Sequence, residues 1–130
     1  MSRLTDRDVL ARALEIIRHQ WCQGAFVAEV RKPIQLPDGR RAHKTYCMIG
    51  ALMRVMRLTY DNHNLRHPRL DRIAGRLLRE IREAYPDWWN RERPDFPHPT
   101  RAWVVERFND NHTHEDMIRV CEKALAREDW

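Results

Sequence analysis

The sequence predicts a mainly helical fold, a small four-helix bundle-like domain. An irregular or short β-hairpin insertion separates the first two helices, and an aromatic/Pro loop follows the third. Three observations carry this prediction. Four segments repeat apolar residues at helical spacing, and the turn residues Pro33, Pro37, Asp38 and Gly39 cluster between the first two of them. The chain of 130 residues, with 42% hydrophobic content, suits one core, so residues 1–130 are expected to form a single domain.

The first helix is expected from about residue 6 to 22. Thr5 with Asp8 three positions later is a typical start signal, because the two side chains satisfy backbone groups of the first turn. In the insertion that follows, Ile34–Leu36 precedes the turn residues and Arg41–Tyr46 comes after them. This order is compatible with a short hairpin or an ordered loop, and the sequence leaves open whether residues 26–46 form strands.

The second helix, expected over Tyr46–Leu58, is apolar on nearly every side and should be the buried centre of the fold. The small pair Gly50–Ala51 in its middle would let another backbone come close. After a polar connector, a third helix is predicted from an apolar stripe that begins at Leu70 and ends at Tyr85 before Pro86.

Residues 86–100 are expected to form an ordered aromatic loop, and residues 101–108 a regular element of uncertain type. Thr113, with Asp116 three residues later, should cap a last helix. Trp130 is either frayed or packed on the domain.

Composition excludes several classes. No apolar run reaches the roughly 18 residues of a membrane span, and the first eight residues alternate charges instead of forming an apolar signal-peptide core. The three cysteines, Cys22, Cys47 and Cys121, lack C-x-x-C spacing, which favours neither a disulfide framework nor a zinc ribbon. His112 and His114 lack a matching second pair of metal ligands. We therefore expect a cytoplasmic protein with no metal, no cofactor and no membrane partner.

Charge is distributed unevenly along the chain. The formal net charge is +5, yet residues 31–82 hold 13 Arg or Lys against 4 acids, and residues 83–130 hold 7 against 11. A basic segment of this kind attracts phosphate or an acidic protein face. A nucleic-acid-binding module that uses residues 31–82 is therefore one alternative function. Four arginines of the third helix share one face: Arg69, Arg72, Arg76 and Arg79.

The aromatic loop supplies the best interaction candidate, because tryptophan and arginine dominate binding hot spots. Combined with the arginine stripe, it predicts a non-catalytic accessory protein that binds a protein partner. The loop residues assigned to this surface are Trp88, Trp89, Arg91, Arg93 and Phe96. The competing interpretation is a lid folded onto the core of the domain itself.

Cys47 supports the main alternative, a small-ligand binder or thiol hydrolase. It lies at or near the start of a helix, where free N–H groups lower a thiol pKa, and Asn109 or Asp110 could orient a histidine. The competing interpretation is a small hydrophobe in a packed helix, in which case no residue is catalytic.

Three short motifs carry a resemblance to a known family. They are Trp21–Phe26 (W-x-x-G-A-F), Cys47–Leu52 (C-x-x-G-A-L) and Phe108–Asp110, an aromatic residue followed by N-D. Together they resemble a family of small proteins of unknown function from bacteria and their phages, over about residues 10–125. The resemblance implies no activity. It points to Trp21, Gly24, Ala25, Phe26, Cys47, Gly50, Ala51, Asn109 and Asp110, which are typical of architecture more than of catalysis.

Overall fold

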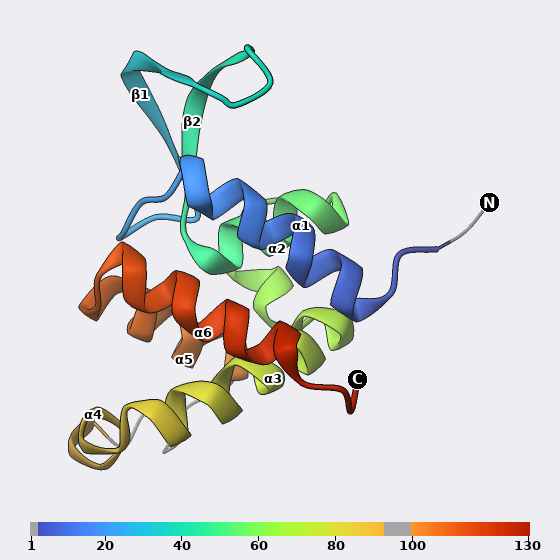
Figure 1. Cartoon of the computed structure of the whole chain (residues 1–130), viewed down its shortest axis with the longest axis vertical. Helices are drawn as coiled ribbons and strands as arrows, with labels where there is room; N and C mark the ends of the chain where they lie inside the picture. Colours follow the sequence, from blue (N-terminus) through green and yellow to red (C-terminus); the bar gives the residue numbers. More distant parts are fainter. Residues whose placement is uncertain (1–2, 93–99) are drawn as a thin grey trace.

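The computed structural model describes residues 3–92 and 100–130, and it confirms a mainly helical fold with a hairpin between the first two helices (Figure 1). The elements in chain order are α1 (Asp6–His19), β1 (Val27–Gln35), β2 (Arg41–Tyr46), α2 (Met48–Met56), the 3₁₀ helix η1 (Asn62–Arg66), α3 (Pro68–Ala84), α4 (Pro86–Glu92), α5 (Arg101–Asn111) and α6 (His114–Ala126).

Both predicted capping boxes are present. The Thr5 hydroxyl accepts the Asp8 N–H at 3.0 Å, and the Asp8 carboxylate accepts the Thr5 N–H at 3.1 Å. Thr113 and Asp116 exchange the same pair of bonds at the start of α6. The first helix ends at His19 and not near residue 22, because Gln20 leaves the helical conformation and Trp21 pairs with Tyr46 instead.

As predicted, helix α2 forms the buried centre of the fold, because its first six residues, Met48–Met53, are all buried. It packs against α1, α5 and β2. Its last turn reaches the surface, where Arg54 and Arg57 are exposed. Arg57 ends the helix in the left-handed conformation, with φ of 59°.

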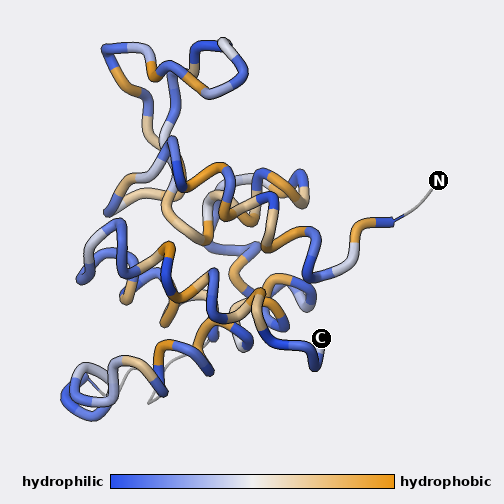
Figure 2. The backbone as a smooth tube through the Cα atoms, in the orientation of Figure 1, coloured by the Kyte–Doolittle hydropathy of each residue, from blue (hydrophilic) through white to orange (hydrophobic). Residues whose placement is uncertain are grey.

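Helix α3 lies against α5 and α6, and its apolar stripe is buried as predicted. Figure 2 shows hydrophobic positions recurring along α1, α3 and α6. The segment after α3 differs from the expected loop, because Pro86 begins α4. Proline has the backbone angle of a first helical residue and lacks an N–H that would be unpaired there, so it starts a helix as readily as it ends one.

The hairpin consists of two antiparallel strands. Val27 pairs with Tyr46 at its base and Gln35 with Arg41 near its tip, and the register shifts between Glu29 and Ile34. Pro33, which cannot donate a backbone hydrogen bond, lies within that irregular stretch. The hairpin projects from the helical body at the end opposite α4 (Figure 1).

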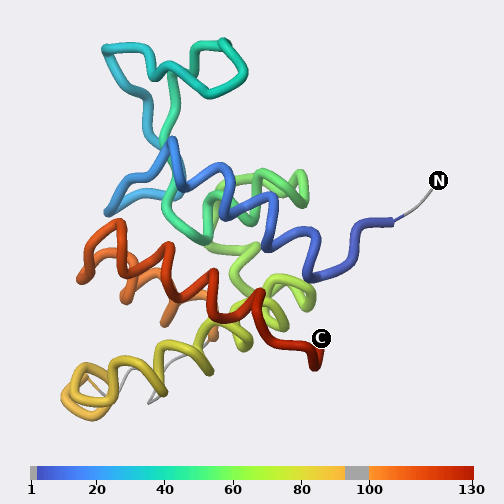
Figure 3. The backbone as a smooth tube through the Cα atoms, in the orientation of Figure 1, coloured from blue at the N-terminus to red at the C-terminus, as the bar shows by residue number. Residues whose placement is uncertain are grey.

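The described residues share one hydrophobic core, to which α1–α6 all contribute. Figure 3 shows α6 beside α1, so the first and last helices cover one side of α2 and α3 together. Within the described chain, none of the helices is long and apolar enough to cross a bilayer.

Candidate functional site

The residues of the three sequence motifs meet around the side chain of Asn109, which is fully buried in α5. Its Oδ1 accepts the indole N–H of Trp21 at 2.8 Å and the backbone N–H of Met48 at 3.0 Å. Its Nδ2 donates to the carbonyl of Cys22 at 3.1 Å. We call Asn109 and these partners the Asn109 hub. It ties the chain after α1, the start of α2 and the end of α5 together.

Asp110 and Gln23 extend the hub at its exposed edge. The Asp110 carboxylate accepts the N–H of Gly24 at 2.9 Å, and Gly24 has a φ of 81° that favours glycine. Gln23 Nε2 donates to the carbonyls of Asn109 at 3.1 Å and His112 at 2.8 Å. Asn109 and Asp110, the candidates for orienting a histidine, are thus engaged with the backbone of residues 22–24.

Cys47 caps the start of α2, close to where the sequence placed it. Its Sγ accepts the Gly50 N–H at 3.3 Å, and the side chain is fully buried. Burial raises the pKa of this thiol far above its usual range, because a thiolate would be desolvated there. The Sγ lies 3.8 Å from Oε1 of Glu106. Among the described residues, no histidine is hydrogen-bonded to the thiol, so the arrangement does not favour a reactive thiolate.

Glu106 is a titratable neighbour of the hub that the sequence interpretation did not single out. Partial burial in α5 raises the pKa of its carboxyl to about 7, and the nearby charge of Asp110 adds to the effect. Asp110 lies one turn later on the same helix. A spacing of four residues places the two carboxyls side by side only in a helix, and the sequence does not establish that residues 101–108 are helical.

We expect Glu106→Gln to stabilise the protein at pH 8 by about 1–2 kcal/mol, after allowance for solvent screening of a partly exposed group. The unfolded carboxyl loses its proton near pH 4.5 and the folded one near pH 7. The folded state therefore binds more protons between these values, and wild-type stability falls as pH rises through that window. Glutamine removes the charge and should remove this loss.

Urea unfolding of both proteins at pH 5 and pH 8 measures the difference, with the exposed Glu29 in β1 changed to glutamine as the control. Glu29→Gln should leave the pH dependence unchanged. An equal advantage of Glu106→Gln at both pH values would show that the carboxyl does not titrate in this window.

The predicted partner surface divides into buried and exposed parts. Trp88 and Trp89 in α4 are only 6% and 9% exposed, and Trp88 packs edge-on against Phe108. Arg91 is exposed, with Nε 3.7 Å from Glu92 Oε1. Arg93 and Phe96 lie outside the described residues. The part of the tryptophan segment that the structure describes is therefore helical and packed onto the core of the domain.

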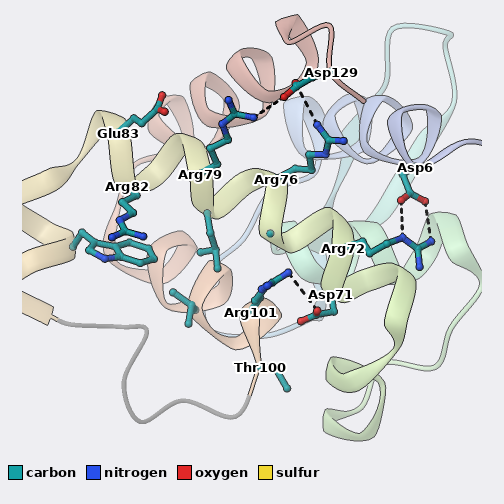
Figure 4. A pocket seen from close by; sticks show the side chains of 14 residues that line it. Asp6, Asp71, Arg72, Arg76, Arg79, Arg82, Glu83, Thr100, Arg101 and Asp129 are labelled. Carbon is teal, nitrogen blue, oxygen red and sulfur yellow. Dashed lines mark hydrogen bonds and ion pairs between the residues drawn. The ribbon is translucent and has the colours of Figure 1, made fainter.

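The arginine stripe of α3 makes ion pairs with segments distant in sequence. Arg69 and Arg72 both bind the carboxylate of Asp6 at the start of α1, with Nε–O distances of 2.8 and 3.1 Å. Arg76 and Arg79 both reach Asp129, at 3.4 and 2.8 Å (Figure 4). The sequence predicts that the four arginines share one face of α3, but no local pattern identifies the carboxylates that pair with them.

An open groove of about 1140 Å³ runs along this face of α3. We call it the arginine groove. Five arginines line it, together with four acids and the edge of Trp89: Arg72, Arg76, Arg79, Arg82 and Arg101 with Asp6, Asp71, Glu83 and Asp129. Arg82 lies over the ring of Trp89, 5.6 Å from its centroid. Arg101 in α5 is 3.6 Å from Asp71.

Residues 127–130, which we call the tail, lie against α3 next to this groove. Besides the Asp129 ion pairs, Arg76 lies over the indole of Trp130 at 4.5 Å from the ring centroid. The indole N–H of Trp130 donates to the carbonyl of Ala124 at 3.0 Å, so this residue is packed and not frayed. Arg127 binds the buried Glu80 and the exposed Glu83. The carboxylate of Asp129 and the indole of Trp130 thus already contact two arginines of the groove, Arg76 and Arg79.

No group of three or more His, Cys, Asp or Glu residues suited to a metal ion occurs within residues 3–92 and 100–130. The model of one protein family, described as a family of unknown function (DUF6197), matches residues 1–127 of the chain. No curated protein and no solved structure matches it.

Proposed function

The chain belongs to DUF6197, a family of unknown function, and from its own residues we propose that it is a non-catalytic accessory protein that binds an acidic face of a protein partner through the arginine groove. The proposal keeps the expected bacterial or phage origin, supported by the three sequence motifs, and the cytoplasmic location. The three cysteines are free thiols, which agrees with a reducing compartment.

One observation supports the proposal: the tail already makes, in this groove, the kinds of contact that we propose for the partner. Asp129 binds Arg76 and Arg79, and Trp130 lies under Arg76. Carboxylate–arginine pairing and arginine–indole stacking are the contacts that commonly dominate protein interfaces. An acidic and aromatic segment of a partner would find the same contacts at the neighbouring Arg82, whose guanidinium lies over the ring of Trp89. Within the described residues, no carboxylate lies within ion-pair distance of Arg82.

The mixture of charges in the groove favours a protein over a nucleic acid. Four carboxylates stand among the five arginines, so the local field is weak and a polyphosphate chain would be repelled at several points. The basic segment 31–82, on which the nucleic-acid alternative rests, is spread over the projecting hairpin, α2, η1 and α3 (Figure 1). The other alternative, centred on Cys47, gains no support from a buried, protonated thiol.

Fluorescence anisotropy with a labelled peptide in which one tryptophan is flanked by two acidic residues, and which is otherwise uncharged, tests the proposal. Arg82→Gln, which removes the exposed groove arginine without a carboxylate partner among the described residues, should weaken binding about threefold to fivefold, the range expected for one exposed ion pair. Asp129→Asn should strengthen it by a similar factor, because it frees two arginines. Arg41→Gln, which removes one exposed arginine from β2, is the matched control and should change nothing.

The same measurement is repeated with a labelled oligodeoxythymidine of equal charge. Tighter binding of the oligonucleotide, with affinity lost in Arg41→Gln instead of Arg82→Gln, would contradict the proposal and favour the nucleic-acid alternative.

A further inference from the structure

A second basic hollow lies on the other side of α1, where the hairpin tip approaches α1 and the last turn of α2. It has a volume of about 620 Å³, within the range of small-molecule sites, and we call it the hairpin cleft. Its cationic lining comes from three separate elements: Arg12 of α1, Arg40 of the turn, and Arg54 and Arg57 at the end of α2. Its apolar lining is Ile16, Leu36, Pro37 and Val55.

Most of the cations in this cleft lack a neutralising carboxylate. The two acids that line it are already engaged, since Asp38 binds Arg40 at 2.6 Å and Glu15 contacts Arg18 and His19. Within residues 3–92 and 100–130, no carboxylate is within ion-pair distance of Arg12, Arg54 or Arg57. The arginine groove, where acids nearly balance the arginines, differs in this respect.

Arg57 supplies a second observation. It occupies the left-handed position that ends α2, with φ of 59° and ψ of 39°, and Leu58 N–H donates to the Met53 carbonyl at 2.8 Å. Glycine suits this position, and a side chain there strains the backbone. It is the one non-glycine residue of the described chain with a positive φ. The guanidinium is thus kept at a position where the fold itself would favour glycine.

The turn that closes the cleft is held in place by its own hydrogen bonds. Leu36 and Gly39 are tied by a bond of 3.0 Å, and Asp38 accepts from both the N–H and the Nε of Arg40. The apolar side chains of Leu36 and Pro37 are therefore presented to the cleft on a fixed loop. A cleft wall with arginines on one part and apolar side chains on another suits a ligand that has an anionic end and an apolar end.

We infer that the hairpin cleft binds a small organic phosphate, with the phosphate held by the arginines of α1 and α2 and an apolar body covered by the hairpin turn. A guanidinium donates two parallel hydrogen bonds to a phosphate, which makes arginine the preferred partner of this group. The ligand would be small, because the cleft has a volume of only about 620 Å³. This inference is independent of the partner proposed for the arginine groove.

Isothermal titration calorimetry with phenyl phosphate as the probe tests the inference, with inorganic phosphate and phenol as comparison ligands. Phenyl phosphate should bind saturably, at least about tenfold more tightly than inorganic phosphate, since burying the ring adds apolar contact area. Phenol, which lacks the anion, should not bind measurably.

Arg57→Gly is the decisive variant, because it removes the guanidinium while relieving the backbone. It should raise the midpoint of thermal unfolding and weaken phenyl phosphate binding about tenfold. Arg66→Gln, an exposed arginine of η1 away from the cleft, is the control and should bind as the wild type does.

Four outcomes would overturn the inference: no saturable binding of phenyl phosphate, equal affinity for phenyl phosphate and inorganic phosphate, unchanged binding by Arg57→Gly, or a lower unfolding midpoint for Arg57→Gly. The last would mean that the Arg57 side chain is needed for the fold. None of these outcomes bears on the peptide measurements at the arginine groove.

Discussion

Gly50→Ala is expected to lower the free energy of unfolding by about 3 kcal/mol or more, since both partners in the resulting clash are backbone. A methyl group on Gly50 would lie 1.8 Å from the carbonyl oxygen of Phe26 and 2.6 Å from its carbonyl carbon. No rotamer change relieves such a contact, so the segment after α1 would have to move away from α2. The Asn109 hub, which joins the same two segments, would be pulled apart.

The direction of the stability change distinguishes this clash from ordinary helix propensity, because alanine normally stabilises a helix interior by about 1 kcal/mol relative to glycine. Gly75→Ala in α3 is the matched control. A methyl group there meets only the Arg101 side chain, at 3.0 Å from its Nη1, and that flexible side chain can move aside. Urea unfolding of both variants should show Gly50→Ala strongly destabilised and Gly75→Ala neutral or slightly stabilised. A stabilised Gly50→Ala would refute the close approach of Phe26.

Asn109→Ala is expected to cost about 3 kcal/mol, because it removes four side-chain hydrogen bonds at once and leaves buried groups without partners. The amide N–H of Met48 and the carbonyl of Cys22 have no other partner of similar quality in the hub. The indole N–H of Trp21 would also lose its acceptor. A cavity the size of the missing amide adds to the loss.

Asn111→Ala, two residues later on the same helix, is the control. Its amide donates only to the carbonyl of Arg107 at the surface, so the change should stay within about 0.5 kcal/mol. Asn109→Asp tests the amide nitrogen separately from the oxygen: the carboxylate keeps both acceptor bonds but loses the donor bonds to the Cys22 carbonyl and the Asp110 carboxylate. We expect a loss at least as large as that of Asn109→Ala, and one that grows with pH, because the new charge is fully buried and lies beside Asp110. A loss below 1 kcal/mol for Asn109→Ala would show that the hub contributes little to stability.

Local signals in the sequence were enough to predict α1, α3 and α6. The pairs Thr5–Asp8 and Thr113–Asp116 act within one turn, so their meaning does not depend on the rest of the fold. The small pair Gly50–Ala51 also predicts the close approach of another backbone, and the structure has Phe26 at that place. Pro86 predicts the end of α3 but does not reveal that α4 begins at the same residue. A proline can follow one helix and start the next, and its local sequence does not distinguish the two roles.

The candidate sites were harder to predict because their contacts join distant parts of the chain. Asp6 and Asp129 lie 66 and 50 positions from Arg72 and Arg79, and no local pattern pairs them. The hairpin cleft combines α1, a turn and the end of α2, and its most unusual feature is a backbone angle at Arg57. Helical periodicity in the sequence predicts neither these ion pairs, nor the cleft, nor the Arg57 backbone angle, since each depends on how complete elements pack.

The Asn109 hub also constrains when the domain can form during synthesis. The bonds from Trp21 and Met48 to Asn109 span 88 and 61 positions. A nascent chain that has emerged only as far as α3 therefore exposes the Met48 amide and the inner surface of α2 without their acceptor and cover. Loop closure over such separations is slow compared with local helix formation. The segment that forms α5 must therefore leave the ribosome before the first half of the chain can complete its native core.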